Sequence, residues 1–183
     1  MDDHNGNGAA QNRFAIGADP ELSAQVRKEL ADTLKARAGI APETLEKELA
    51  GRDIHAQFLA AFGELGLVPD TLPDLLAGHM IAMWSVVHDA PLPARSVAMA
   101  IAKQFAGLIG SNPLAADPAK RQLMGEALLY ETVLTLEAQG QARASSDSAM
   151  LKQMAESAQR NYLSQNSINL RKTRLTESGM VRV

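Results

Sequence analysis

The chain has no cysteine and few aromatic residues, and each shortage narrows the possibilities. Without cysteine there can be no disulfides, no thiolate metal sites and no cysteine nucleophile. Aromatic residues are only 4% of the 183 residues, so we expect a core built from Leu, Ile, Val, Met and many Ala residues. Small alanine faces let helices approach closely, which favours helix-on-helix packing over a β-sandwich.

A large excess of charge of one sign is also absent. The formal net charge is -3 and the pI is near 5.8. A general nucleic-acid binder needs clustered cations to displace counterions, so we expect no nucleic-acid partner. One short basic cluster, Arg171, Lys172 and Arg174, lies near the C-terminus. It has two interpretations: charges that protect an edge strand from aggregation, or a docking strip for an acidic partner.

No stretch of the sequence predicts a membrane span or a leader. Residues 72–87 are apolar, but the run is too short and too interrupted by Asp74 and His79 to span a membrane. Residues 1–8 contain neither a positively charged region nor an apolar region, so we expect no signal peptide. Residues 1–12 are polar and glycine-rich and predict a disordered tail, followed by a single helical domain over residues 13–183.

Residues 72–87 predict the centre of the fold. A helix built from them is apolar on almost every face. Such a helix is usually surrounded by other helices, because any exposed side would leave large side chains in water. The segment therefore indicates an all-helical domain arranged around one buried helix, and it carries no recognisable chemistry of its own.

Helix start and stop signals divide the rest of the chain. Aspartate followed by proline favours a helix start, because the carboxylate accepts from free N–H groups and proline fits the first turn. Starts are predicted at Asp19-Pro20, Pro42, Asp53, Asp117-Pro118 and Asp147. One further helix follows a break at residues 89–93. The helix that starts at Asp117 is expected to end near Gln139, before a loop over residues 140–146.

The C-terminal segment departs from the helical pattern. Residues 170–181 are enriched in Thr and Val and contain a Ser-Gly pair, which predicts a strand, or a strand and a turn. Its expected partner is the short strand Arg13-Phe14-Ala15-Ile16, because isolated strands leave backbone groups unpaired. The predicted fold is all-α: a bundle of about six to seven helices around the central apolar helix, with a small terminal β ribbon.

Three sequence blocks carry a resemblance to a known family. They are Leu65-Gly66-Leu67 with Asp70-Thr71-Leu72 and the helix through Trp84, then residues 120–123 leading into 126–129, and the ending at residues 175–181. With these blocks the chain resembles a family of uncharacterised small bacterial proteins, a domain of unknown function, many of whose members look exported. The resemblance implies a mostly helical periplasmic or secreted protein. It brings no activity, and the expected lack of a signal peptide departs from the family.

The segment His79-Met80-x-x-Met83 is the one candidate metal site. One helical turn places His79 and Met83 on the same face with Met80 beside them, and imidazole and thioether ligands suit Cu(I). The alternative is that the two methionines fill gaps in the core and His79 has an ordinary hydrogen-bond partner. We favour the core interpretation, because no methionine-rich loop accompanies the segment, and we expect no metal and no cofactor.

Carboxylates on the helix that starts at Asp117 are the candidate catalytic groups. Glu126, Glu131 and Glu137 lie along it, and paired carboxylates can act as general acid and base. The helix has no histidine at the spacing of a di-iron site. A structural role is therefore favoured, with Glu126 partly buried and paired with an arginine. If the protein is an enzyme, its expected catalytic residues are His79, Glu126 and Glu131.

These observations lead to three hypotheses about function. The first is a non-enzymatic exported protein that acts by binding another protein, without a membrane span. The second is an enzyme whose site forms only in the fold, and the third is a carrier of a small apolar ligand between helices. A cavity that holds at least two titratable groups with shifted pKa values would favour the enzyme. A large exposed apolar patch without such a cavity would favour protein binding.

Overall fold

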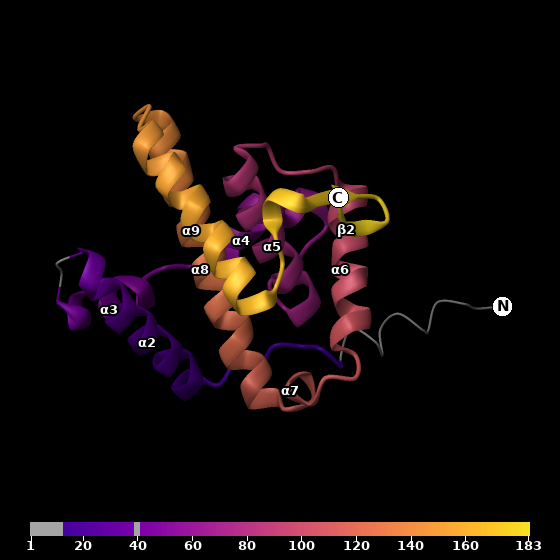
Figure 1. Cartoon of the computed structure of the whole chain (residues 1–183). Coiled ribbons are helices and arrows are strands. Elements are labelled where there is room, and N and C mark those ends of the chain that lie inside the picture. The colour runs from indigo at the N-terminus through magenta and orange to yellow at the C-terminus, as the bar shows by residue number, and fades with distance from the viewer. Residues whose placement is uncertain (1–12, 39–40) are drawn as a thin grey trace.

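A computed structural model describes residues 13–38 and 41–183 (Figure 1). The expected disordered tail, residues 1–12, lies outside the described residues. The helices are α2 (Pro20–Ala38), α3 (Pro42–Ala50), α4 (Ile54–Phe62), α5 (Leu72–His88), α6 (Arg95–Ile109), α7 (Pro113–Ala116), α8 (Pro118–Ala144) and α9 (Ser148–Asn166). Two short 3-10 turns, η1 (Gly63–Leu65) and η2 (Leu170–Lys172), complete the helical part, and the strands are β1 (Thr173–Thr176) and β2 (Gly179–Arg182). The all-α prediction with a small terminal β ribbon is confirmed.

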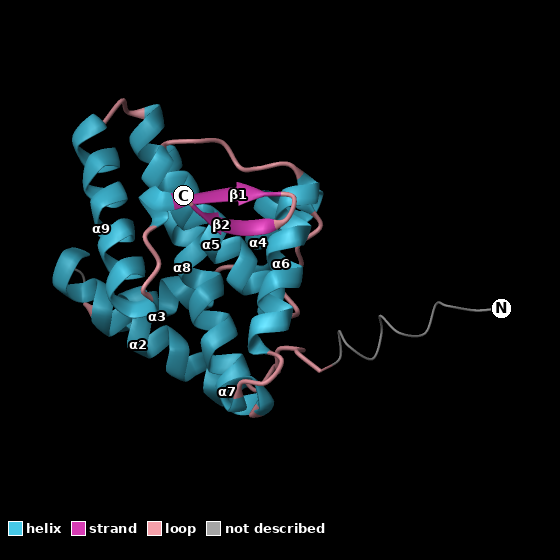
Figure 2. Ribbon diagram, turned by 45° about the vertical axis from the view of Figure 1, so that its right-hand side comes forward, coloured by secondary structure: helices cyan, strands magenta, loops and turns pink. Residues whose placement is uncertain are grey.

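Helix α5 is the centre of the bundle, as its sequence predicts. It packs against α8, α6 and α9, which surround it in the two overall views (Figures 1 and 2). Most of its side chains are buried, including Leu75, Met80 and Ile81. Burying a large apolar side chain contributes about 1.5–3 kcal/mol, so this helix supplies much of the stabilisation of the fold.

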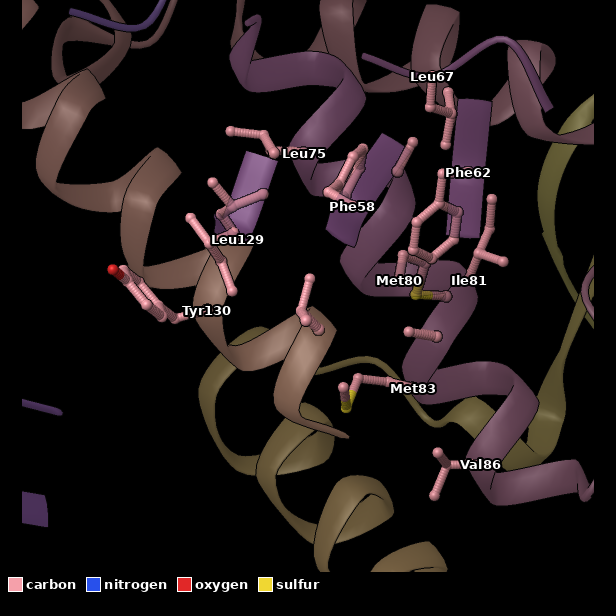
Figure 3. Packing of buried hydrophobic residues seen from close by; sticks show 14 of the residues in the cluster. Phe58, Phe62, Leu67, Leu75, Met80, Ile81, Met83, Val86, Leu129 and Tyr130 are labelled. Carbon is pink, nitrogen blue, oxygen red and sulfur yellow. The ribbon is translucent and has the colours of Figure 1, made fainter. Parts of the chain in front are cut away.

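Helix α4 packs across α5 through two phenylalanines (Figure 3). Phe58 and Phe62 are fully buried, with ring centroids 4.8 Å apart. The close approach of the Phe58 ring to α5 depends on Gly78 of that helix. A Cβ atom at that position would lie 2.7 Å from Cζ of Phe58, which is inside van der Waals contact. With few aromatic residues in the chain, the fold places two of them together against Gly78 of α5.

The predicted aspartate caps are present at the helix starts. Asp53 accepts a hydrogen bond from the Ala56 backbone N–H, and Asp147 accepts one from Met150. Asp117 accepts from two N–H groups at the start of α8. These bonds satisfy donors that have no partner within the helix, and each is typically worth about 1 kcal/mol.

The prediction that α8 ends near Gln139 and is followed by a loop over residues 140–146 is wrong. The helix continues through Gly140 to Ala144, so most of the expected loop is helical. Gln139 and Ala142 are buried on either side of Gly140. A glycine inside a helix costs only about 1 kcal/mol, which the burial of its neighbours offsets. The short helix α7 was not predicted either.

The C-terminal segment folds back on itself as a hairpin. β1 and β2 are antiparallel, and Leu175 lies opposite Met180. Gly179 follows the turn with a φ of +102°, which glycine adopts without strain. As alternation predicts, Thr173 and Leu175 lie on the packed face while Arg174 is exposed. The ribbon rests on α6 (Figure 2).

The predicted pairing of the two chain ends is wrong. Ala15 forms a bridge with Thr71 instead, and the Leu72 backbone N–H donates to the Phe14 carbonyl over 3.0 Å. The hairpin closes through a short turn, and a short loop loses less entropy than one joining the chain ends. The N-terminal segment therefore runs beside the start of α5. Within the part of the chain that the structure describes, no helix is long and apolar enough to cross a membrane.

Candidate functional site

The structure brings two of the three candidate catalytic residues together. His79 of α5 and Glu131 of α8 approach to 3.3 Å between Nε2 and Oε2. A residue not predicted, Tyr162 of α9, completes the cluster, with its hydroxyl 2.7 Å from Nδ1 of His79. The two rings are stacked, with centroids 5.6 Å apart. Tyr162 lies 83 positions from His79, and no sequence spacing links them.

The surroundings of Tyr162 keep its hydroxyl protonated. Burial raises the pKa of the Tyr162 hydroxyl well above its ordinary value, and the negative charge of Glu131 raises that pKa further. The hydroxyl therefore keeps its proton. In the tautomer in which Nδ1 of His79 accepts that proton, the imidazole N–H is on Nε2, where it faces the Glu131 carboxylate.

This cluster connects three helices and offers little to a substrate. Tyr162 is buried, and the His79 side chain is 13% exposed, while that of Glu131 is 56% exposed. The raised pKa of Tyr162 makes its phenol a poor nucleophile at neutral pH. Each bond in such a network typically contributes about 0.5–1.5 kcal/mol, so the cluster holds α5, α8 and α9 together.

Glu126, the third candidate catalytic residue, lies in a separate polar cluster. It is buried, as expected, but its hydrogen-bond partners among the described residues are not arginines. Ser23 donates to Oε1 of Glu126 over 2.6 Å, and Nε2 of Gln122 donates to the same atom over 2.9 Å. Gln122 also donates to the Asp19 carbonyl over 2.7 Å. The cluster therefore attaches the start of α2 to α8.

The candidate metal residues are divided between the apolar core, which holds the two methionines, and the His79–Glu131–Tyr162 cluster. Met80 and Met83 are buried among apolar side chains (Figure 3), and the hydrogen-bond partner of His79 is Tyr162. Across residues 13–38 and 41–183, no group of three His, Cys, Asp or Glu side chains is placed to hold a metal ion. Glu137 pairs with Arg52 at 2.7 Å near the molecular surface.

The cavities open to solvent include one at the end of the bundle and one between two helices. The end cavity, of about 400 Å³, lies where the N-terminal segment meets the end of α6, α7 and the start of α8. The second, of about 380 Å³, is a groove between α4 and α8. Among the described residues, the pKa values of Asp74, Tyr130 and Tyr162 are shifted, and burial is the main cause of the rise in each. None of these three lines either cavity.

Positive charge gathers on α6 and the C-terminal segment, which we name the α6–hairpin surface. The ribbon packs along α6, and Ser96 of the helix donates to the Glu177 carboxylate at the hairpin turn over 2.8 Å. Six exposed cations lie on these two parts of the chain: Arg95, Lys103, Arg171, Lys172, Arg174 and Arg182. Arg171 and Lys172 belong to η2, which packs on α5 and α9 at the end of the ribbon. The sequence analysis identified the cluster of Arg171, Lys172 and Arg174. It did not identify Arg95 and Lys103, which are far from that cluster in the sequence, or Arg182, which the hairpin turn separates from it.

The α6–hairpin surface also exposes apolar side chains. Four of the eight large apolar residues exposed in the described chain lie on these two elements, namely Met99, Leu108, Val181 and Val183. None of the six cations takes part in an ion pair of the described residues. The surface therefore combines unneutralised positive charge with exposed aliphatic groups.

Comparisons of the chain with protein-family models, with curated proteins and with solved structures found no match.

Proposed function

We propose that this protein is a non-enzymatic binding protein that docks an acidic segment of a partner protein on its α6–hairpin surface. One observation carries the proposal: the separation of charge within the chain. α6 and residues 170–183 contain six cations and one carboxylate, a net charge of +5 in a chain of net charge -3. The rest of the chain therefore has a net charge of -8. Complementary charge steers partners and selects among them.

The composition of the surface favours a protein partner over other polyanions. Single-stranded nucleic acid is usually held by aromatic side chains that stack on bases, and membrane surfaces by Trp and Tyr anchors. The α6–hairpin surface exposes Met, Leu and Val but no aromatic side chain, since Phe105 of α6 is partly buried. An acidic segment with a few apolar residues matches both its charge and its aliphatic groups.

The cavities support a binding role over catalysis. The three groups whose pKa is shifted lie outside both cavities, so neither cavity combines space for a substrate with a perturbed acid or base. We further propose an exported protein, periplasmic or secreted, because the resemblance implies export. Fractionation of cells that produce the full gene product tests this location.

Charge reversal tests the docking surface. The immobilised protein should capture its partner from a native extract, and a synthetic peptide of the partner's acidic segment should bind in a calorimeter, more weakly as salt rises. Arg171→Glu, Lys172→Glu and Arg174→Glu together should abolish both results. The matched control reverses three exposed cations elsewhere, Lys28, Lys152 and Arg160, and should bind like the wild type.

Four outcomes would overturn the proposal. A control variant that binds as weakly as the surface variant would indicate a response to net charge alone. A captured partner without an acidic segment would contradict the proposal, and so would an acidic peptide that binds the surface variant and the wild type equally. Tighter binding to phosphatidylglycerol vesicles or to duplex DNA than to the peptide would assign the surface to a different kind of partner.

A further inference from the structure

The end cavity has the make-up of a binding site for a small organic acid. Its lining residues are Arg13, Phe14, Ile109, Gly110, Ser111, Asn112, Pro113, Ala116 and Arg121. Two of these are cations, and none of the lining residues that the structure describes is acidic. The rest of the wall is mostly apolar. Ligand cavities typically combine apolar walls with a few polar groups in volumes of about 300–1,000 Å³, and the volume of about 400 Å³ lies in that range.

Arg13 is held in place at the cavity. Its guanidinium lies over the Phe14 ring, 5.2 Å from the centroid, and Nη2 donates to the backbone carbonyl of Gly110. A guanidinium has five N–H donors, so one bond to a carbonyl leaves others available to a ligand. The cation–π contact and the hydrogen bond restrict the side chain before any ligand binds, which reduces the entropy lost on binding.

Arg121 approaches the same cavity from the first turns of α8. Its Nε donates to the Ala15 carbonyl over 3.2 Å, which joins the helix to the N-terminal segment. That segment is itself fixed, since the Ile16 backbone N–H donates to the Asp70 carbonyl over 2.9 Å.

The walls of the cavity select the body of the ligand. Phe14 is buried against Leu72 in a small apolar cluster, so its ring forms a rigid wall. Ile109, Pro113 and Ala116 add aliphatic surface. A planar carboxylate matches the fork of a guanidinium, and an apolar body matches these walls. We propose that the end cavity binds a monocarboxylate with a small aromatic or short aliphatic body.

Calorimetric titration of the full chain tests this site with benzoate and hexanoate as probes. Both acids should bind saturably, and the neutral analogues benzamide and hexanamide should bind at least ~tenfold more weakly, because they lack the charge that strengthens a bond to arginine. Inorganic phosphate should also bind more weakly, because it has no apolar body. Equal binding of acid and amide, equal binding of phosphate, or no saturable binding of either acid would overturn the proposal.

Variants locate the site. Arg13→Met and Arg121→Met should each weaken benzoate binding by ~tenfold or more, since each removes one charged donor. Lys120→Met is the matched control, because Lys120 is exposed beside Arg121 but does not line the cavity. If Arg121→Met lowers the melting temperature, the test of the site rests on Arg13→Met, because Arg13 is exposed and its replacement should leave the fold intact. Wild-type affinity in Arg13→Met, or an equal loss in Lys120→Met, would place the binding elsewhere.

Discussion

At the scale of single residues, Trp84 joins the central helix to the C-terminal ribbon. The indole is half-buried, and its N–H donates to the Thr173 carbonyl over 2.8 Å. Its ring packs against His88, with centroids 4.5 Å apart. Trp84 therefore stabilises the fold through one hydrogen bond as well as through the burial of part of its ring.

Trp84→Ala should lower the free energy of unfolding by about 2–3 kcal/mol, less than the 3–5 kcal/mol typical of a fully buried ring. Trp84→Phe retains an aromatic ring but loses the N–H, and should cost about 1 kcal/mol. Urea denaturation measures both, with the exposed Leu163→Ala on α9 as the control, expected within about 0.5 kcal/mol of the wild type. A loss below about 1 kcal/mol for Trp84→Ala would contradict the joining role.

Tyr162 makes stability sensitive to alkaline pH. Its pKa is raised in the folded state above the ordinary value of 10.0, first by burial and then by the charge of Glu131. The folded state thus favours the protonated form. Its contribution to stability is fully present below pH 10.0 and is lost as the pH rises above that value.

Tyr162→Phe should therefore flatten the alkaline fall in stability, although it removes a hydrogen bond and costs about 1 kcal/mol at neutral pH. The measurement is the urea midpoint at neutral pH and at several values above pH 10.0. Burial also raises the pKa of Tyr130, so a residual slope is expected. An alkaline slope identical to that of the wild type would exclude Tyr162 as its source.

At the scale of elements, glycines reveal which helix surfaces are in contact. Gly78 lies inside α5 against the Phe58 ring, whereas a Cβ atom on Gly140 of α8 would have no atom within 4 Å. Both positions are helical, so replacement by alanine brings the same gain in helix propensity. Any difference between the two substitutions therefore reports packing.

Gly78→Ala should destabilise the protein by about 1–3 kcal/mol, because the new methyl group displaces Phe58 in a packed core. Gly140→Ala should stabilise it by about 0.5–1 kcal/mol, because alanine restricts the unfolded chain and meets nothing in the fold. Thermal and urea denaturation of the pair check the opposite signs. Stabilisation by both substitutions would mean that α4 and α5 are less closely packed than the structure shows.

The outer edge of β2 is covered by a side chain rather than by another strand. The Met180 backbone N–H donates to Oε1 of Gln104 over 2.7 Å, and Nε2 of Gln104 donates to the Met180 carbonyl over 3.4 Å. The amide of Gln104 thus occupies the place of a peptide group in a neighbouring strand. It satisfies backbone groups that an edge strand usually leaves free.

Gln104→Leu should expose these groups, costing about 1–3 kcal/mol and accelerating hydrogen exchange at the Met180 amide. The Val183 amide, which donates to the Lys172 carbonyl over 2.9 Å within the hairpin, is the internal control. Its exchange should stay near the wild-type rate. Faster exchange at both amides would indicate that the whole ribbon opens, and an unchanged Met180 rate would contradict the edge contact.

At the scale of the whole molecule, the fold is stabilised by an apolar core and by polar clusters between helices. The chain has no cysteine, and the described residues offer no group of metal ligands. Dialysis against a chelator should therefore leave the melting temperature unchanged, which differential scanning calorimetry checks. A fall of several degrees would contradict this prediction and would identify His79 and Glu131 as the first residues to substitute.

Local signals in the sequence determined the elements. The caps at Asp53, Asp117 and Asp147 were predictable because a carboxylate bonds to N–H groups within three positions of itself. The central place of α5 was predictable because a helix apolar on every face must be enclosed. The error at Gly140 has the same origin: glycine is a local stop signal, and only distant packing overrides it.

Contacts between distant residues were decided by the tertiary structure alone. The sequence identified His79 and Glu131 but not the contact of His79 with Tyr162, and it identified the cluster with Arg174 but not the exposed cations of α6, the helix on which the ribbon packs. The hairpin closed on itself instead of pairing with residues 13–16, and the end cavity formed between residues far apart in the chain. Periodicity shows which face of a helix is buried. It does not show which helix covers that face, because packing and loop closure over the whole chain determine that choice.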